Sequence, residues 1–168
     1  MTEHSEGMVA SKSVGRDHKR LTLELVTPEK VAWSAPADFV VLPALGGEMG
    51  VLPGHMPFLA QLAPGEVRVK SGVETKRFAV SGGFAEIKDD TVSLFAETAE
   101  MAEQIDSERA HQALEKAKAA RAGVEPGLDP MQLTMMEAAI RRAQVRLRVS
   151  RRARTVAPHV DQGEPEKG

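Results

Sequence analysis

The alternation of apolar and polar residues along the chain changes its period once, near residue 100. Before that point apolar side chains recur at every second position, as at Leu21, Leu23 and Leu25, with polar residues between them. A period of two is that of a β-strand with one buried and one exposed face. Residues 21–99 are therefore predicted to form short strands.

Later segments of this half continue the pattern and are separated by turns. The apolar positions that we assign to strands are Val67 and Val69, Phe78 and Val80, and Phe84 and Ile87. Glycine, proline and aspartate pairs such as Gly82-Gly83 and Asp89-Asp90 punctuate the segments and leave no room for helices. Half-apolar strands are typical of antiparallel sheets that pack face to face or close on themselves. An antiparallel β-sandwich or a flattened barrel of short strands is predicted for residues 19–101.

After Glu103 the composition turns to Ala, Glu, Lys, Arg, Gln and Met, which favour helices. Asp106 is a suitable N-cap for a first helix, Ile105 packs against Ala110 at its start, and Gly123 ends it. Small residues spaced three and four apart are expected to form its apolar stripe: Ala110, Ala113, Ala117 and Ala120.

A second helix is predicted to begin at Asp129 as N-cap, with Pro130 in the first helical position. Its apolar stripe consists of Leu133, Met136, Ile140, Ala143 and Leu147. The two helices form an antiparallel hairpin over residues 102–154. Alanines bury little apolar area, at about 25 cal/mol per Å², so we expect a hairpin that is weakly self-packed and able to detach.

Composition excludes several classes of protein and site. The chain has no cysteine, which rules out disulfides and thiolate metal sites and suits an intracellular protein. Its net charge of −2 gives no general attraction to nucleic acid or an anionic membrane. The longest apolar run, at residues 39–45, is far below the roughly 20 residues that span a bilayer. Residues 1–18 and 155–168 are polar and predicted to be flexible tails.

No arrangement of residues in the sequence predicts an active site or a metal site. The glycine-rich segment at residues 46–50 lacks the following lysine of a phosphate-binding loop, so we interpret it as a turn that displays Glu48 at its tip. His55 lies in a turn between Pro53 and Pro57. It is either an interface residue or a histidine bonded to a nearby carbonyl.

Arginines gather on and just beyond the second predicted helix: Arg141, Arg142, Arg146, Arg148, Arg151, Arg152 and Arg154. Three interpretations of this arginine cluster are compatible with the sequence. They could solvate the helix C-terminus and complement its dipole, or bind nucleic acid, although this half of the chain has no aromatic residue. The third alternative is an anionic partner, since Arg142 and Arg146 share one helix face and could hold a phosphate or an acidic protein surface.

Several segments together resemble the epsilon subunit of F-type ATP synthases. They are GEMGVLPGHMPFLAQLAPGEVRV, FAVSGGFAEI, TVSLFAETAE and IDSERA, in the order and spacing of that family, and the similarity covers residues 21–149. The resemblance implies a non-catalytic rotor subunit whose β-sandwich of about ten strands binds the gamma subunit and sits on the c-ring. Glu48 and His55 would then lie toward the c-ring.

The resemblance also implies roles for the hairpin. In the family it alternates between a folded position on the sandwich and an extended one in the α/β catalytic hexamer, where it inhibits ATP hydrolysis. Some members bind regulatory ATP on the folded hairpin. The matching residues here are Ile105, Asp106, Arg109, Ala110, Arg142 and Arg146. For Asp106 the N-cap role is an equally good explanation.

The resemblance therefore predicts a central-stalk subunit that couples proton-driven c-ring rotation to ATP synthesis through gamma. It would need no cofactor beyond the possible regulatory ATP, and it would reach the cytoplasmic face of a bacterial inner membrane only through the complex. The alternative is a stand-alone binding module whose arginine-rich helix recruits nucleic acid or an acidic partner.

Overall fold

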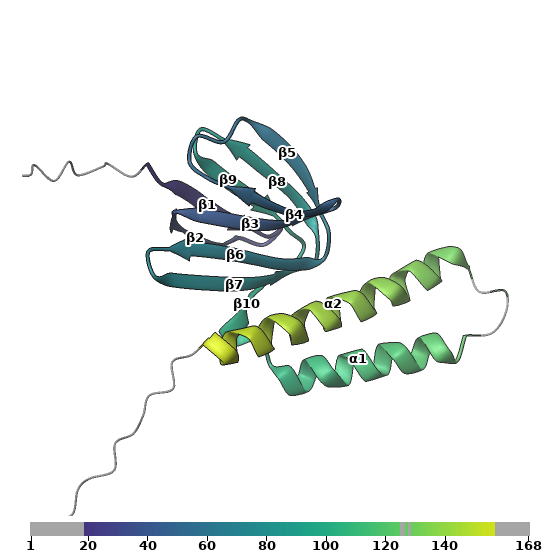
Figure 1. The fold of residues 1–168 in the computed structure, drawn as a ribbon. Helices are drawn as coiled ribbons and strands as arrows, with labels where there is room; N and C mark the ends of the chain where they lie inside the picture. Colours follow the sequence, from purple (N-terminus) through teal and green to yellow (C-terminus); the bar gives the residue numbers. More distant parts are fainter. Residues whose placement is uncertain (1–18, 125–126, 128, 157–168) are drawn as a thin grey trace, which may run out of the picture.

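The computed structural model describes residues 19–124, 127 and 129–156. In these residues ten strands are followed by a short 3₁₀ helix and two long α-helices (Figure 1). The strands are β1 (Leu21–Val26), β2 (Val31–Ala37), β3 (Phe39–Ala44), β4 (Gly47–Val51), β5 (Phe58–Leu62), β6 (Gly65–Ser71), β7 (Glu74–Val80), β8 (Gly83–Lys88), β9 (Thr91–Phe95) and β10 (Ala99–Met101). The helices are η1 (Ala102–Gln104), α1 (Ser107–Ala122) and α2 (Pro130–Val156).

The predicted tails are only partly within the described residues. Residues 1–18 and 157–168 lie outside them. The second helix continues to Val156, two residues beyond the end expected from the sequence.

All ten strands belong to one hydrogen-bonded sheet that folds back on itself. The strand order is β10-β7-β6-β3-β5-β8-β9-β1-β2, and β4 pairs with β3 outside this path. Every pairing is antiparallel except that of β1 with β9. This architecture confirms the predicted antiparallel β-sandwich of about ten strands followed by an α-helical hairpin.

Alternate residues of the strands fill the sandwich core, as the two-residue period predicted. Leu21, Leu23 and Leu25 are fully buried, and the core cluster also contains Val67, Val69, Phe78, Val80, Ile87 and Leu94. The assignment of Phe84 to the buried face was wrong, since its side chain is 51% exposed. Side chains alternate between the two faces of a strand, so Phe84 cannot share a face with Ile87, three residues later.

The predicted caps of both helices are confirmed. The Asp106 carboxylate accepts a hydrogen bond from the Arg109 backbone N–H at 3.0 Å, and Asp129 accepts one from the Met131 N–H at 3.1 Å. Gly123 caps the C-terminus of α1. These local interactions fix where each helix begins or ends.

The apolar stripe of α1 differs from the predicted alanine series. Ala110 is buried as expected, but Ala113 and Ala120 are exposed and the buried position between the helices is taken by Leu114. On α2, Ala143 and Leu147 are buried, whereas the more distal predicted positions are only half-buried. Packing between the helices is therefore concentrated near the sandwich.

The hairpin and the sandwich have separate apolar cores. The hairpin cluster consists of Ala79, Ala102, Ile105, Ala110, Leu114, Ala143, Val145, Leu147 and Val149. Ala79, on β7, is its one member from the sandwich strands. The C-terminal half of α2 lies beside β6, β7 and β10, while the distal ends of both helices extend away from the sheet (Figure 1).

Candidate functional site

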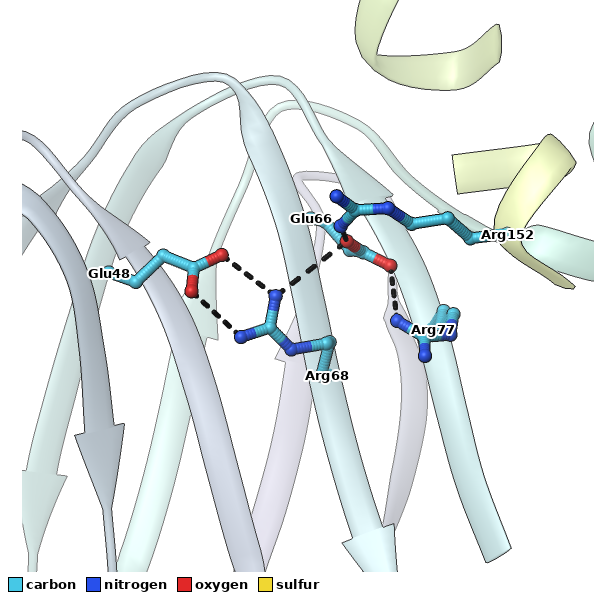
Figure 2. A network of polar contacts seen from close by, with 5 residues as sticks. All are labelled: Glu48, Glu66, Arg68, Arg77 and Arg152. Carbon is cyan, nitrogen blue, oxygen red and sulfur yellow. Dashed lines mark hydrogen bonds and ion pairs between the residues drawn. The ribbon is translucent and has the colours of Figure 1, made fainter. Parts of the chain in front are cut away.

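A network of five charged side chains lies on the outer face of the sandwich, where α2 approaches it (Figure 2). Arg68 of β6 donates one hydrogen bond to each carboxylate oxygen of Glu48, at 2.7 and 2.8 Å. This pairing lowers the pKa of Glu48 and raises that of Arg68, because each charged form stabilises the other. Glu48 lies in strand β4, not at the tip of a turn, and this corrects the prediction from the glycine-rich segment.

Glu66 forms the buried centre of the same network. Only 5% of its side chain is exposed, and it accepts hydrogen bonds from Arg77 of β7 at 2.7 Å and from Arg152 of α2. Arg68 lies 3.8 Å from it. The cluster therefore joins strands β4, β6 and β7 to the C-terminal end of the hairpin.

His55 lies in the turn that follows β4. Its backbone N–H donates to the Leu52 carbonyl at 3.1 Å, and its Nδ1 lies 2.7 Å from the Met56 carbonyl oxygen. The neighbouring Gly54 N–H donates to the Asp90 carboxylate at 2.6 Å and, as the first cause, lowers the pKa of Asp90. The prediction that His55 bonds to a nearby carbonyl is confirmed, and its role at an interface stays a prediction.

A cavity of about 290 Å³ lies between the hairpin and the edge of the sandwich. Arg142 and Arg146 of α2 line it, together with Glu100 of β10 and small residues of β7. Arg146 forms an ion pair with Glu100 at 2.9 Å, whereas Arg142 is exposed and has no ion-pair partner among the described residues. The volume is near the lower end of the range of about 300–1,000 Å³ for small-molecule pockets.

The other four residues of the predicted nucleotide site do not line this cavity. Ile105 and Ala110 belong to the buried hairpin cluster, and the Asp106 carboxylate caps α1. Arg109 is exposed on α1. The structure thus brings together Arg142 and Arg146 but leaves the motif at the start of α1 outside the cavity.

A row of apolar side chains crosses the outer face of four neighbouring strands. Phe84 of β8 pairs with Phe95 of β9, Phe95 with Val26 of β1, and Val26 with Val31 of β2. Phe84, Phe95 and Val31 are 46–59% exposed, and Val26 is half-buried. Exposed apolar side chains in such a row are typical of interaction surfaces. This row was not predicted from the sequence. Its signal there was Phe84, an apolar residue at a strand position whose side chain points to the exposed face.

The arginines of α2 do not form one free basic face. Arg146 and Arg152 pair with carboxylates of the sandwich, and Arg141 pairs with Glu137 one turn earlier on the helix. Arg154 lies where the side chains are not described. These ion pairs neutralise charges that a nucleic-acid surface would need.

The described ranges contain neither a candidate metal site nor a candidate membrane-spanning helix. Over residues 19–124, 127 and 129–156, no group of three or more His, Asp or Glu side chains could hold a metal ion. Over the same residues, neither α-helix has the length and apolarity needed to cross a bilayer.

Comparison with protein families gives matches over both parts of the chain. Residues 20–102 match the family model described as ATP synthase, Delta/Epsilon chain, beta-sandwich domain, and residues 103–151 match the corresponding long alpha-helix domain. The ATP synthase epsilon chain of Nitratidesulfovibrio vulgaris is 44% identical over 131 residues, 78% of this chain and 96% of that protein. That of Dehalococcoides mccartyi is 42% identical over 136 residues, 80% of this chain and 95% of that protein.

Two solved structures have a similar fold. A chain of the Euglena gracilis mitochondrial ATP synthase, from a structure of OSCP/F1/c-ring, superposes with a TM-score of 0.63 at 26% identity, covering 92% of this chain and 91% of that one. A chain of the Tetrahymena thermophila mitochondrial ATP synthase central stalk and c-ring gives a TM-score of 0.50 at 13% identity, covering 79% and 95%. The chain therefore belongs to the ATP synthase delta/epsilon family, as an epsilon chain, a non-catalytic subunit of the F-type ATP synthase.

Proposed function

We propose that this chain works in the central stalk of the rotor, where its sandwich joins the gamma subunit to the c-ring and its hairpin restrains ATP hydrolysis. In this role it transmits proton-driven rotation of the c-ring to gamma. The observation that carries the proposal is the separation of the two apolar cores, which have no residue in common; Ala79 is the one residue of a sandwich strand that belongs to the hairpin cluster. Because each part has its own core, the hairpin can leave the sandwich while the sandwich stays folded.

The apolar row of Phe84, Phe95, Val26 and Val31 is the surface that we assign to gamma. It crosses four paired strands, so its backbone is rigid before any partner binds. Large exposed aromatic side chains on a fixed surface are efficient contacts, since little side-chain entropy is lost when they are covered.

Glu48 and His55 are the residues that we assign to the c-ring. The Glu48 side chain is 60% exposed even while it pairs with Arg68, so its carboxylate still reaches a basic group of a partner. His55 is half-buried in the turn after β4. A carboxylate held on a rigid strand can bind a polar, basic loop of a partner through complementary charge.

The hairpin is the element that we assign to the α/β hexamer and to regulatory ATP. Leaving the sandwich breaks two ion pairs, Arg146 with Glu100 and Arg152 with Glu66, and makes these arginines available to an acidic surface. In the folded position Arg142 and Arg146 line the cavity beside β7 and offer guanidinium groups to a phosphate. ATP bound there would favour the folded hairpin, because the cavity exists only in that position.

This function places the chain at the cytoplasmic face of a bacterial inner membrane, held there through its partners. In this role the chain itself does not enter the bilayer.

A chain that ends at Gln104 tests the proposal, because it keeps all ten strands and η1 and lacks both α-helices. In a reconstituted complex we expect it to bind gamma with the affinity of the full chain and to raise the rate of ATP hydrolysis. Loss of gamma binding would contradict the assignment of docking to the sandwich. Unchanged hydrolysis, with binding intact, would contradict the inhibitory role of the hairpin.

A further inference from the structure

The C-terminal end of α2 is attached to the sandwich through a carboxylate that has other partners. Glu66 accepts a hydrogen bond through Oε1 from Arg77 at 2.7 Å, and through Oε2 from Arg152 of α2 (Figure 2). Arg77 lies on the strand next to Glu66, so this pair forms within the sandwich. The bond from Arg152 is the part of the network that the hairpin contributes.

Release of Arg152 would not leave an isolated buried charge. Loss of the only ion-pair partner of a buried carboxylate strongly destabilises a folded protein. Glu66, however, would keep Arg77 at 2.7 Å and Arg68 at 3.8 Å. The Arg152 side chain is already 50% exposed, so it returns to water with little change in solvation. This bond can therefore open and close while the sandwich remains folded.

Arg68 and Arg152 face the same oxygen of Glu66. Nη1 of Arg68 lies 3.8 Å from Oε2, the atom to which Arg152 donates. The same Nη1 donates to Glu48 at 2.7 Å, and the second nitrogen of the guanidinium also binds Glu48. Glu48 thus keeps Arg68 beside, but not on, the oxygen that holds the helix.

We propose that these side chains form a latch for the hairpin, in which Glu66 holds Arg152 and Glu48 prevents Arg68 from displacing it. A cation that takes the Glu48 carboxylate releases Arg68 to bind Glu66. Two guanidinium groups then compete for one oxygen, and the hold on Arg152 weakens. The inference rests on the proposed function, in which the hairpin leaves the sandwich, and it adds a route by which contact at Glu48 loosens the hairpin.

Opening of the latch can be measured in the full-length chain because the protein has no cysteine. Ala79 is 4% exposed and belongs to the hairpin cluster beside the cavity, so a thiol in Ala79→Cys reacts faster with a thiol reagent when the hairpin lifts. Its reaction rate is proportional to the open fraction when opening is fast and reversible.

In this background we expect Arg152→Gln to raise the labelling rate about five-fold and Glu48→Gln to raise it about two-fold. Changes of this size correspond to the loss of one partly exposed ion pair. Arg148→Gln is the matched control. It removes the same charge from the same helix, and the Arg148 side chain forms no ion pair with Glu66. Its labelling rate should equal that of the parent.

A second reporter separates release of the hairpin from unfolding. Ala85 lies in the sandwich core with no exposed surface, and the thiol of Ala85→Cys should keep its rate when Arg152 is replaced. An unchanged rate at position 79 in Arg152→Gln, an equal rise in Arg148→Gln, or an equal rise at position 85 would each overturn the latch. An unchanged rate in Glu48→Gln would overturn the role of Glu48.

These measurements need no ATP synthase, so the latch and the proposed function can fail separately. If the chain ending at Gln104 raises hydrolysis but Arg152→Gln does not speed labelling, the hairpin is inhibitory and is held by other contacts. If labelling responds as expected but hydrolysis does not, the latch stands and the inhibitory role fails.

Discussion

Arg68 binds both carboxylate oxygens of Glu48 from the far side of strand β3. In the sheet register Glu48 lies opposite Pro43 and Arg68 lies opposite Val41, so the pair bridges three strands, β4, β3 and β6. Two parallel charge-assisted hydrogen bonds make this geometry specific. Glu48 is therefore a structural residue as well as the residue that we assign to the c-ring.

This pair predicts a dependence of stability on pH. Arg68 holds the pKa of Glu48 below its ordinary value of 4.5, so the folded state favours the ionised carboxylate. The stabilisation is complete above pH 4.5 and is lost as pH falls through the lowered pKa of the folded state. Because the side chain is 60% exposed, we expect only about 0.5 kcal/mol.

Urea unfolding of the parent and of Glu48→Gln at a series of pH values measures this contribution. The difference in free energy of unfolding should be constant from neutral pH to about 4.5 and should vanish at more acidic pH. It should also shrink in high salt, because the pair is near the surface. A difference that stays the same throughout this acidic range would mean that Arg68 does not act through the charge of Glu48.

The exposed apolar row predicts a variant that loses gamma binding and keeps its fold. Phe84→Ser removes an aromatic ring that is 51% exposed and pairs with Phe95, so the free energy of unfolding should fall by only about 1 kcal/mol. Affinity for gamma, measured by titration calorimetry, should fall about tenfold or more if the ring is a central contact. Val73→Ser is the control, since Val73 is fully exposed in the turn between β6 and β7. An equal loss in both variants would argue against the row as the docking surface.

The cavity between hairpin and sandwich predicts which residues bind ATP. Arg142 lines it and has no ion-pair partner among the residues described, so Arg142→Ala should lower ATP affinity about tenfold through loss of a charge-assisted hydrogen bond. Asp106→Asn should leave the affinity unchanged, because asparagine is as good an N-cap and the side chain does not line the cavity.

Arg141→Ala is the matched control for Arg142→Ala. Arg141 pairs with Glu137 and does not line the cavity, so its removal should not alter ATP affinity. If calorimetry instead finds that Asp106→Asn weakens ATP and Arg142→Ala does not, the ligand binds at the start of α1, as the family resemblance implied.

Local sequence chemistry was sufficient to predict the division of the chain into strands and helices and the ends of the helices. The change of hydrophobic period near residue 100 separated strands from helices, and Asp106, Gly123 and Asp129 marked helix ends through bonds to nearby backbone. Such signals act over a few residues, so they can be read without knowledge of the tertiary structure.

The contacts that connect distant segments could not be predicted in this way. Arg152 and Glu66 are 86 residues apart in the sequence, and their pairing depends on where α2 crosses the sheet. The burial of Leu114 in place of Ala113 likewise depends on the rotation of α1 against α2. Phe84 was misassigned because an aromatic residue on an exposed strand face looks like a core residue in a single sequence.

The separate apolar cores predict that equal truncations in the two parts have different consequences. Leu94 is fully buried in the sandwich, and Leu147 is 7% exposed in the hairpin cluster. Leu94→Ala should cost the sandwich about 3 kcal/mol. Leu147→Ala should destabilise only the docked hairpin, because Leu147 belongs to the hairpin cluster and not to the sandwich core. Trp33, whose ring is tilted against that of Phe78 with centroids 5.0 Å apart, reports on the sandwich, and far-UV circular dichroism reports on the helices.

In urea, Leu94→Ala should shift the Trp33 fluorescence transition to lower denaturant, whereas Leu147→Ala should shift the helical signal and leave the fluorescence transition in place. Both variants remove the same side-chain atoms, so each is the control for the other. If Leu147→Ala shifts the two signals together, the sandwich and hairpin unfold as one cooperative unit. A hairpin bound that cooperatively could not lift from the sandwich without unfolding it, and both the inhibitory movement and the latch at Glu66 would have to be abandoned.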